Sequence, residues 1–310
     1  MNTREDLQKI HSATLEVLSE VGVHVGCKDA LNTFEKGGCH VDRETMTARI
    51  PGDIIEEAVK SSPSGFTLYG KTSDFDICLA DGKVYHSPFG AAPQFEDPVT
   101  GEVRDPKKED LANCAAVIDA LDEYNFCFST MTARDVDSNY CNIHSFEAHY
   151  TRCRKPILAS CSRKWTVEYD IEMAAMERGG LDKLREKPPI MFGCCTISPL
   201  VIPVEACEVL MTAAENNIPV ANMTMSTCGG QAPVTLAGSA IIANAENLAA
   251  LVLTQLVRKG ARYVCGGSPG ISDMRHAAAA VVGCPEAGLL SAVMADLGRM
   301  YGIPTLIGGT

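Results

Sequence analysis

The sequence has 310 residues, of which 46% are hydrophobic and 21% are charged, so it can bury a sizeable core. Its formal net charge is −12 and it has no basic stripe, which argues against nucleic-acid binding because phosphate recognition depends on clustered Lys and Arg. The opening MNTREDLQKI has no signal-peptide core, and we find no run of about twenty apolar residues, so we expect a soluble cytoplasmic protein without membrane contact.

Three helices are predicted near the N-terminus. Apolar residues recur on one helical face over residues 5–21, and Gly22 is a typical stop signal. A shorter helix is expected to end at Gly37-Gly38. A third is expected to begin after Pro51, because proline is favoured in the first turn of a helix.

A β-hairpin is predicted after these helices. In FDICLADGKVYHSP the apolar positions alternate around Asp81-Gly82, a dipeptide typical of type I′ hairpin turns. We interpret residues 1–105 as a helical and β-hairpin cap or oligomerisation region. We also expect the complete protein to form a homo-oligomer.

From about residue 107 the sequence alternates regularly between helical stretches and short apolar runs. This alternation is typical of βαβ units with right-handed crossovers on a parallel sheet. The expected helices cover residues 107–122, 138–153, 166–178, 203–217, 235–259 and 285–301. The expected strands cover residues 126–133, 156–162, 189–197, 218–226, 261–268 and 303–310.

The number of strands bears on the type of α/β fold. An α/β barrel has eight strands and typically takes about 250 residues, whereas we count six strands. We therefore expect residues 106–310 to form a TIM-type (β/α)8 barrel that is incomplete in this chain. An open doubly wound sheet also accommodates six strands, but no G-x-G-x-x-G follows any of them, since CGGSPG at 265–270 has the wrong spacing.

The fourteen cysteines have no spacing that suggests a disulfide framework, and a chain of this size does not need one. Several lie near expected strand ends, so a thiolate zinc site is one alternative. However, the sequence has no C-x2-C spacing of the kind that zinc sites use. The adjacent Cys194 and Cys195 should also point to opposite faces of their strand. We predict packing thiols and no metal site.

The stretch from residue 226 to 256 is the most informative internal segment. Gly229 and Gly230 let the backbone turn tightly after a strand. A long alanine-rich helix follows and carries Asn244 and Glu246. Taken alone, Asn244 and Glu246 are most simply interpreted as solvated or helix-capping residues.

Three charged residues lie where strand ends and helix starts are expected. Arg134 and Asp135 are adjacent after the first strand of the repeat region, and an ion pair that steadies a loop is the simplest interpretation. Glu286 lies near a helix N-terminus, where a negative charge is favourable without any catalytic role. The residues alone therefore indicate a barrel-like α/β enzyme whose site is undefined.

Seven stretches of the sequence are informative in their order and spacing. They are IHSATLEVLSEVGVHV (10–25), GKVYHSPFG (82–90), ARD (133–135), SPL (198–200), GGQAPVTLAGS with NAE (229–246), GCPEAGLLSA (283–292) and YGIPTLIGGT (301–310). Together they resemble the trimethylamine methyltransferase family, which also includes the glycine betaine methyltransferases. The resemblance covers nearly the whole chain.

The resemblance implies an α/β barrel in a longer protein. In the pyrrolysine-containing branch of the family, pyrrolysine follows a Gly-Thr pair that Gly309-Thr310 resembles. The catalytic residue would then be a pyrrolysine just after Thr310, encoded by an in-frame amber codon, with the remaining strands downstream. On this interpretation we expect the 310-residue chain by itself to be inactive, and to aggregate or stay partly molten.

The resemblance also implies an activity. It is methyl transfer from trimethylamine to the Co(I) corrinoid of a cognate corrinoid protein, giving dimethylamine, as in the methylamine catabolism of methanogenesis or acetogenesis. No cofactor would be bound directly, since the partner carries the corrinoid. One alternative is a glycine betaine or other quaternary-amine methyltransferase of the branch without pyrrolysine. Another is a non-catalytic scaffold that docks the corrinoid protein.

The resemblance places several residues near the barrel mouth. Gly308, Gly309 and Thr310 would lie beside the reactive centre. Trp165, Phe192 and Tyr263 are aromatic side chains that would be available to hold a cationic methylammonium group. One departure is ASCSR at 159–163, which is less polar than the family pattern. The remaining pocket or rim residues are Arg134, Asp135, Ser198, Gly229, Gly230 and Glu286.

Overall fold

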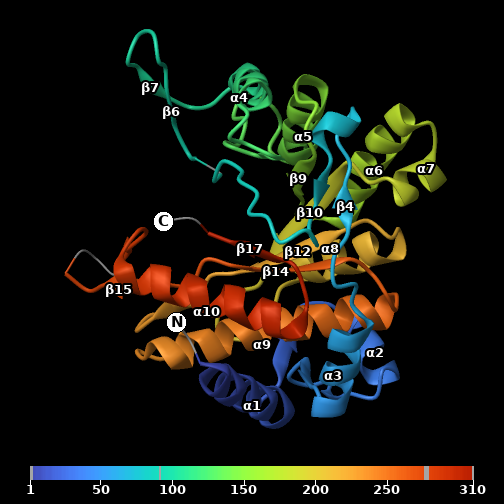
Figure 1. Cartoon of the computed structure of the whole chain (residues 1–310), viewed down its shortest axis with the longest axis vertical. Coiled ribbons are helices and arrows are strands. Elements are labelled where there is room, and N and C mark those ends of the chain that lie inside the picture. The colour runs from blue at the N-terminus through green and yellow to red at the C-terminus, as the bar shows by residue number, and fades with distance from the viewer. Residues whose placement is uncertain (1–2, 91, 276–278, 309–310) are drawn as a thin grey trace. The chain divides into compact units, whose positions relative to one another are not determined.

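The structure is a computed structural model that describes residues 3–90, 92–275 and 279–308. Two compact units make up the chain: Met1–Gly65 with Cys194–Thr310 form unit 1, and Phe66–Gly193 form unit 2. Figure 1 shows the elements of both. The predicted boundary between a cap (residues 1–105) and a barrel (residues 106–310) is a different division of the chain, and it stays a prediction.

Unit 1 contains three of the six expected strands. They are β12 (Val220–Thr224), β14 (Tyr263–Gly267) and β17 (Thr305–Ile307), and they pair in parallel in the order β12, β14, β17. The sequences of β12 and β14 are nearly continuous apolar runs because most of their residues are buried. The predicted positions of these strands are confirmed.

Three helices cover the strands of unit 1. They are α8 (Val204–Glu215), α9 (Leu236–Val257) and α10 (Pro285–Tyr301). Figure 1 shows α9 and α10 running side by side along the strands. By length and composition α9 alone among the described helices could cross a membrane, but 72% of its apolar window is buried inside the protein. It is therefore packed like a core helix.

The N-terminal part of unit 1 contains the three predicted helices and a sheet that the sequence did not reveal. The first helix, α1, begins with a capping box in which Thr3 and Asp6 bond each other's backbone N–H groups. In the sheet, β1 pairs in parallel with β11 from a distant part of the chain, and the strand order is β11-β1-β3-β2. The bounds are α1 (Arg4–Glu20), β1 (Val23–Val25), α2 (Lys28–Lys36), β2 (His40–Asp42), β3 (Thr47–Arg49), α3 (Gly52–Ser61) and β11 (Val201–Ile202).

Unit 2 contains the expected strands β8 and β9 and the first four residues of β10, and β9 pairs in parallel with both β8 and β10. The strand–helix alternation of the two units confirms the α/β class. The sequence did not reveal the short helix α7. The bounds are α4 (Lys108–Ala120), β8 (Cys127–Phe128), α5 (Cys141–Arg152), β9 (Ile157–Ser160), α6 (Lys164–Arg178), α7 (Leu181–Glu186) and β10 (Ile190–Cys195).

The hairpin prediction at Asp81-Gly82 was wrong in its strand pairing. The strand before this turn, β5 (Ile77–Cys78), pairs antiparallel with β4 (Thr67–Leu68) and not with the residues after Gly82. A side chain closes the turn instead of a backbone ladder, because the Tyr85 hydroxyl donates to the Asp81 carboxylate at 2.6 Å. Gly82 does adopt the positive φ, +75°, that the dipeptide suggested.

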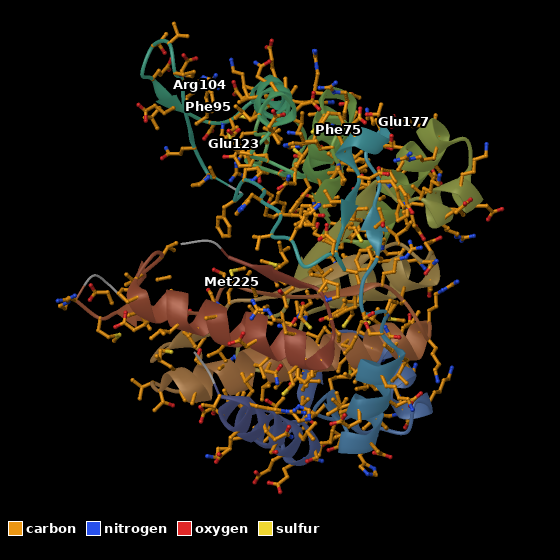
Figure 2. All side chains as sticks on the ribbon, in the orientation of Figure 1. Phe75, Phe95, Arg104, Glu123, Glu177 and Met225 are labelled. Carbon is orange, nitrogen blue, oxygen red and sulfur yellow. The ribbon has the colours of Figure 1, made fainter. Side chains whose placement is uncertain are left out.

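A hairpin does form about fifteen residues later. Strands β6 (Phe95–Glu96) and β7 (Val103–Arg104) pair antiparallel. The turn that joins them is closed by Asp97, whose side chain accepts from the N–H groups of Val99 and Thr100. Figure 2 shows the side chains of Phe95 and Arg104 together on this hairpin, and the guanidinium carbon lies 4.8 Å from the ring centroid. The 3₁₀ helix η1 (Ser73–Phe75) lies earlier in the same unit.

A buried carboxylate joins this hairpin to helix α4. Asp110 accepts two hydrogen bonds from the Arg104 guanidinium, at 2.7 and 2.9 Å, and one from the Lys107 N–H at 2.7 Å. The Arg104 hydrogen bonds are the main reason that the pKa of Asp110 lies below its ordinary value. A carboxyl group with a depressed folded-state pKa adds stability above its unfolded pKa, and this stability is lost as the pH falls through the folded pKa.

We therefore expect Asp110→Asn to lower the free energy of unfolding by about 1.5–3 kcal/mol at pH 7, the usual range for a hydrogen bond to a charged group. The deficit should shrink as the pH falls below 3.8, the ordinary value, because the carboxyl group of the wild type then protonates in the unfolded state before it does in the folded state. Urea unfolding at pH 7 and at acid pH measures both. The exposed Asp122, replaced by Asn, is the matched control. Equal stability of wild type and Asp110→Asn at pH 7 would contradict this expectation.

Candidate functional site

The carboxyl ends of β12, β14 and β17 form one edge of the unit 1 strands. Backbone bonds continue the ladder past the strand ends: Ser268 N donates to Thr224 O at 2.8 Å, and Gly308 N donates to Gly267 O at 2.9 Å. A Cβ atom on Gly308 would lie 2.4 Å from Ser268 Oγ, so the close approach favours glycine. The predicted site residue Gly308 therefore lies at this edge, whereas Gly309 and Thr310 lie outside the described residues.

The strand register sorts the side chains of this edge into two faces. Thr305 contacts Gly298 of α10, so Thr305 faces the helices. The neighbouring row, Met223, Gly266 and Leu306, faces the other way because successive residues of a strand alternate. This second row is apolar, and the side chains of Met223 and Leu306 are only half-buried. It can pack against methyl groups but offers no charge.

A polar cluster behind the strands holds the end of β14. The Asn247 amide donates to Gly266 O at 2.8 Å, and the Tyr263 hydroxyl donates to Asn247 O at 2.9 Å. Tyr263 and Phe192 are both fully buried. They are therefore core residues, and the expectation that they hold a methylammonium group was wrong.

The loop before β11 is fixed to helix α9 by one buried carboxylate. Glu246 accepts from the hydroxyls of Thr196 and Ser198 and from the N–H of Leu200, each at 3.0 Å. Its side chain is fully buried, and this burial raises its pKa. The sequence interpretation of Glu246 and Asn244 as solvated or capping residues was wrong, because both are buried. The predicted rim residue Ser198 is buried with Glu246.

The glycine pair after β12 forms the expected tight turn. Gly229 has φ +77°, and the N–H of Gly230 donates to Thr227 O at 3.1 Å. The turn follows β13 (Thr227–Cys228), which pairs in parallel with β15 (Gly270–Asp273), and β15 pairs antiparallel with β16 (Ala279–Ala280). A Cβ atom on Gly230 would lie 3.0 Å from Ser272 Oγ, so this glycine also permits a close approach.

Glu286 is exposed in the first turn of α10, which fits its expected electrostatic role. Arg134 and Asp135 belong to unit 2, and both are exposed after β8. Asp135 Oδ1 accepts from the N–H of Lys108 at 2.8 Å, so it caps the amino end of α4. The Arg134 N–H donates to Pro106 O at 2.8 Å.

Seven of the fourteen cysteines are buried, six are half-buried and Cys195 is exposed. Burial raises the pKa of the Cys194 thiol, and its sulfur lies 3.7 Å from both Ala221 O and Asn222 Oδ1. Cys194 is buried and Cys195 is exposed, as the opposite-face argument predicts. Among the described residues, no three His, Cys, Asp or Glu side chains come together as a set of metal ligands.

Comparison with known proteins decides the family. A sequence model of the family described as trimethylamine methyltransferase (MTTB) matches residues 1–310. The chain belongs to the trimethylamine methyltransferase family. A family member from Desulfitobacterium hafniense, named trimethylamine methyltransferase MttB, is 34% identical over 98% of this chain and 61% of its own length. A protein of the same species named glycine betaine methyltransferase is 27% identical, over 99% of this chain and 64% of its own length.

The solved structure of the monomethylamine methyltransferase MtmB from Methanosarcina barkeri has the same fold. It superposes with a TM-score of 0.65 at 16% identity, over 99% of this chain and 62% of the MtmB chain. This likeness and the parallel strands of the two units confirm the expected incomplete TIM-type barrel. This chain spans somewhat less than two thirds of the length of each of these relatives.

The sequence did not reveal that Glu246 fixes the loop around Ser198 to helix α9. The signal was present, because the NAE and SPL stretches both contributed to the resemblance. Periodicity did not show that a helix residue and a loop residue 48 positions apart share a hydrogen bond. Glu246 lies between Ala245 and Asn247 on a long apolar helix, and a glutamate is seldom fully buried unless it has partners such as these hydroxyls.

Proposed function

We propose that this protein transfers a methyl group from trimethylamine to the Co(I) corrinoid of a separate cognate corrinoid protein. The observation that carries the proposal is the family match over residues 1–310. The higher identity to the relative named for trimethylamine than to the relative named for glycine betaine supports trimethylamine as the methyl donor. We place the protein in the cytoplasm, where a homo-oligomer would meet its corrinoid partner.

The proposed reaction balances as a group transfer. One C–N bond of trimethylamine breaks, its electron pair stays on nitrogen, and nitrogen gains a proton to give dimethylamine. Co(I) supplies the electron pair of the new Co–C bond and is formally oxidised to Co(III). The tasks left to the protein are to orient the amine and to exclude water, since correct positioning alone can supply much of the rate of a group transfer.

The carboxyl edge of the unit 1 strands suits such positioning. Met223 and Leu306 offer apolar, half-buried surface against which methyl groups can pack. The close backbone approach of Gly308 to Ser268 fixes this edge. Gly229, Gly230 and Glu286 complete the proposed rim.

We expect the native protein, purified from its source with its corrinoid partner, to methylate reduced corrinoid at least tenfold faster with trimethylamine than with glycine betaine. Absorbance spectroscopy follows loss of Co(I), and chromatography measures dimethylamine. Faster methylation from glycine betaine would instead identify the betaine-type activity. Binding of the corrinoid protein without methyl transfer from either donor would identify the scaffold alternative.

A further inference from the structure

Two cysteines that are far apart in the sequence lie together in unit 1. Cys27 follows strand β1 and is the N-cap of helix α2, and Cys207 lies in the first turn of helix α8. The pairing of β1 with β11 brings these segments together, and Gly26 N donates to Ile202 O at 2.8 Å. A Cβ atom on Gly26 would lie 2.3 Å from Val204 N, so the two backbones are in close contact. Cys27, the next residue, therefore lies against the start of α8.

The side chain of Cys207 points toward Cys27. Side chains of a helix tilt toward its amino end, and the Cys207 sulfur lies 3.6 Å from Ile202 O. The same oxygen accepts from Gly26 N. The Cys207 side chain forms a hydrogen bond with the Cys27 side chain, and the N–H groups of Gly26 and Cys27 also face the Cys207 sulfur. The two sulfur atoms are therefore neighbours.

The two thiols differ in access to solvent and in acidity. Cys27 is half-buried beside the exposed Lys28 and Asp29, whereas Cys207 is fully buried. The hydrogen bond with Cys207 and the N–H groups of the first turn of α2 hold the pKa of Cys27 below its ordinary value, although burial and Asp29 oppose them. One of these groups, Ala30 N, lies 3.4 Å from the Cys27 sulfur. Because the thiolate is the reactive form of cysteine, Cys27 is the more reactive thiol of the two.

We propose that Cys27 and Cys207 form a reversible oxidation site for peroxide, in which Cys27 reacts first and Cys207 then closes a disulfide. The Cys27 thiolate attacks one oxygen of hydrogen peroxide, the O–O bond breaks, and a sulfenic acid and water result. Cys207 attacks the Cys27 sulfur, an S–S bond replaces the S–O bond, and the hydroxyl leaves as a second water with the Cys207 proton. In sum, two thiols and one peroxide give one disulfide and two waters, and two electrons pass to the peroxide.

A second pair of thiols, in unit 2, provides an internal comparison. Cys127 and Cys153 also share a side-chain hydrogen bond, but they are only 0% and 1% exposed. Peroxide in solution can reach the half-buried Cys27 directly, whereas it reaches Cys127 and Cys153 only when unit 2 opens. We therefore expect the disulfide between Cys27 and Cys207 to form at least tenfold faster than one between Cys127 and Cys153.

Peptide mapping by mass spectrometry tests the proposal on the native protein after treatment with hydrogen peroxide and alkylation of the remaining thiols. We expect peptides joined through Cys27 and Cys207, which dithiothreitol separates again. Without peroxide, Cys27 should be alkylated by iodoacetamide half-maximally at a pH below 9.0, the ordinary value of a thiol. The matched control is Cys284→Ser, which changes the N-cap cysteine of α10 and should leave the disulfide unchanged.

Two variants establish the order of the steps. Cys207→Ala should stop the reaction at a sulfenic acid on Cys27, which a 1,3-dicarbonyl reagent traps, and Cys27→Ala should leave Cys207 unmodified. The proposal is overturned if peroxide joins no peptides through Cys27 and Cys207, if Cys127 and Cys153 join as fast, or if Cys207→Ala gives no sulfenic acid on Cys27. Mapping of the wild type needs neither variant, so it decides the matter if a variant does not fold. The readout does not involve methyl transfer, so this site and the proposed function can fail separately.

Discussion

Replacing Glu246 by alanine is expected to lower the free energy of unfolding by about 3–5 kcal/mol. The carboxylate accepts from Thr196, Ser198 and Leu200, all three within the loop that leads to β11. Each donor that loses its partner in a buried site costs about 1–3 kcal/mol. The substitution also leaves a cavity at a fully buried position. Chemical denaturation of wild type and variant measures the loss.

Two further variants show whether the loss comes from these hydrogen bonds. Glu246→Gln keeps one carbonyl oxygen for the Leu200 N–H, and the hydroxyls of Thr196 and Ser198 can rotate to accept from the amide, so it should cost much less than alanine. Glu215→Ala, at an exposed position at the end of α8, should change stability by less than about 0.5 kcal/mol. If Glu246→Ala costs no more than Glu215→Ala, the carboxylate does not hold the loop.

Gly298→Ala is expected to destabilise the packing of β17 on helix α10. A Cβ atom at this position would lie 2.0 Å from Thr305 Cγ2 and 3.2 Å from Ile303 O. Either β17 or α10 must move, and overpacking of this kind costs about 1–3 kcal/mol. Because β17 leads directly to Gly308, we also expect the native protein with this substitution to lose at least tenfold in methyl transfer. Unfolding curves and the corrinoid assay measure the two effects.

The same helix offers a matched control. Gly288 also lies in α10, but a Cβ atom there would have no neighbour within 4 Å. Gly288→Ala should therefore stabilise the protein by up to about 1 kcal/mol, because alanine is the better helix former. If both substitutions stabilise the protein, the contact between Gly298 and Thr305 does not constrain β17.

The repeat region shows where sequence reasoning succeeds. Strands such as β12 and β14 are buried runs bounded by helices with their own signals, for example Pro285 at the start of α10 and Gly302 at its end. These signals are local. Each needs only neighbouring residues, so six strands and six helices of this region could be predicted, whereas α7 and the short strands β11, β13, β15 and β16 were not.

The hairpin near residue 81 shows where local signals mislead. The dipeptide Asp81-Gly82 formed a turn, but its strand β5 found its partner in β4, earlier in the chain. A turn signal specifies backbone conformation, whereas strand pairing depends on which other segment presents unpaired N–H and C=O groups. The pairing of β1 with β11 depends in the same way on residues more than 170 positions apart.

The features of the candidate site fall into the same two groups: those that the local sequence sets and those that tertiary contacts set. The sequence by itself determined the α/β alternation, the glycine turn at Gly229-Gly230, and the resemblance that the family match confirmed, because these depend on backbone preference and on ordered short stretches. Only the tertiary structure decided that Glu246 is buried beneath Ser198 and that Asp135 caps α4. It alone also showed that His149 is buried and that its Nε2 has no hydrogen-bond partner. These features depend on burial and on hydrogen-bond partners from other elements, which exist only after the chain has folded.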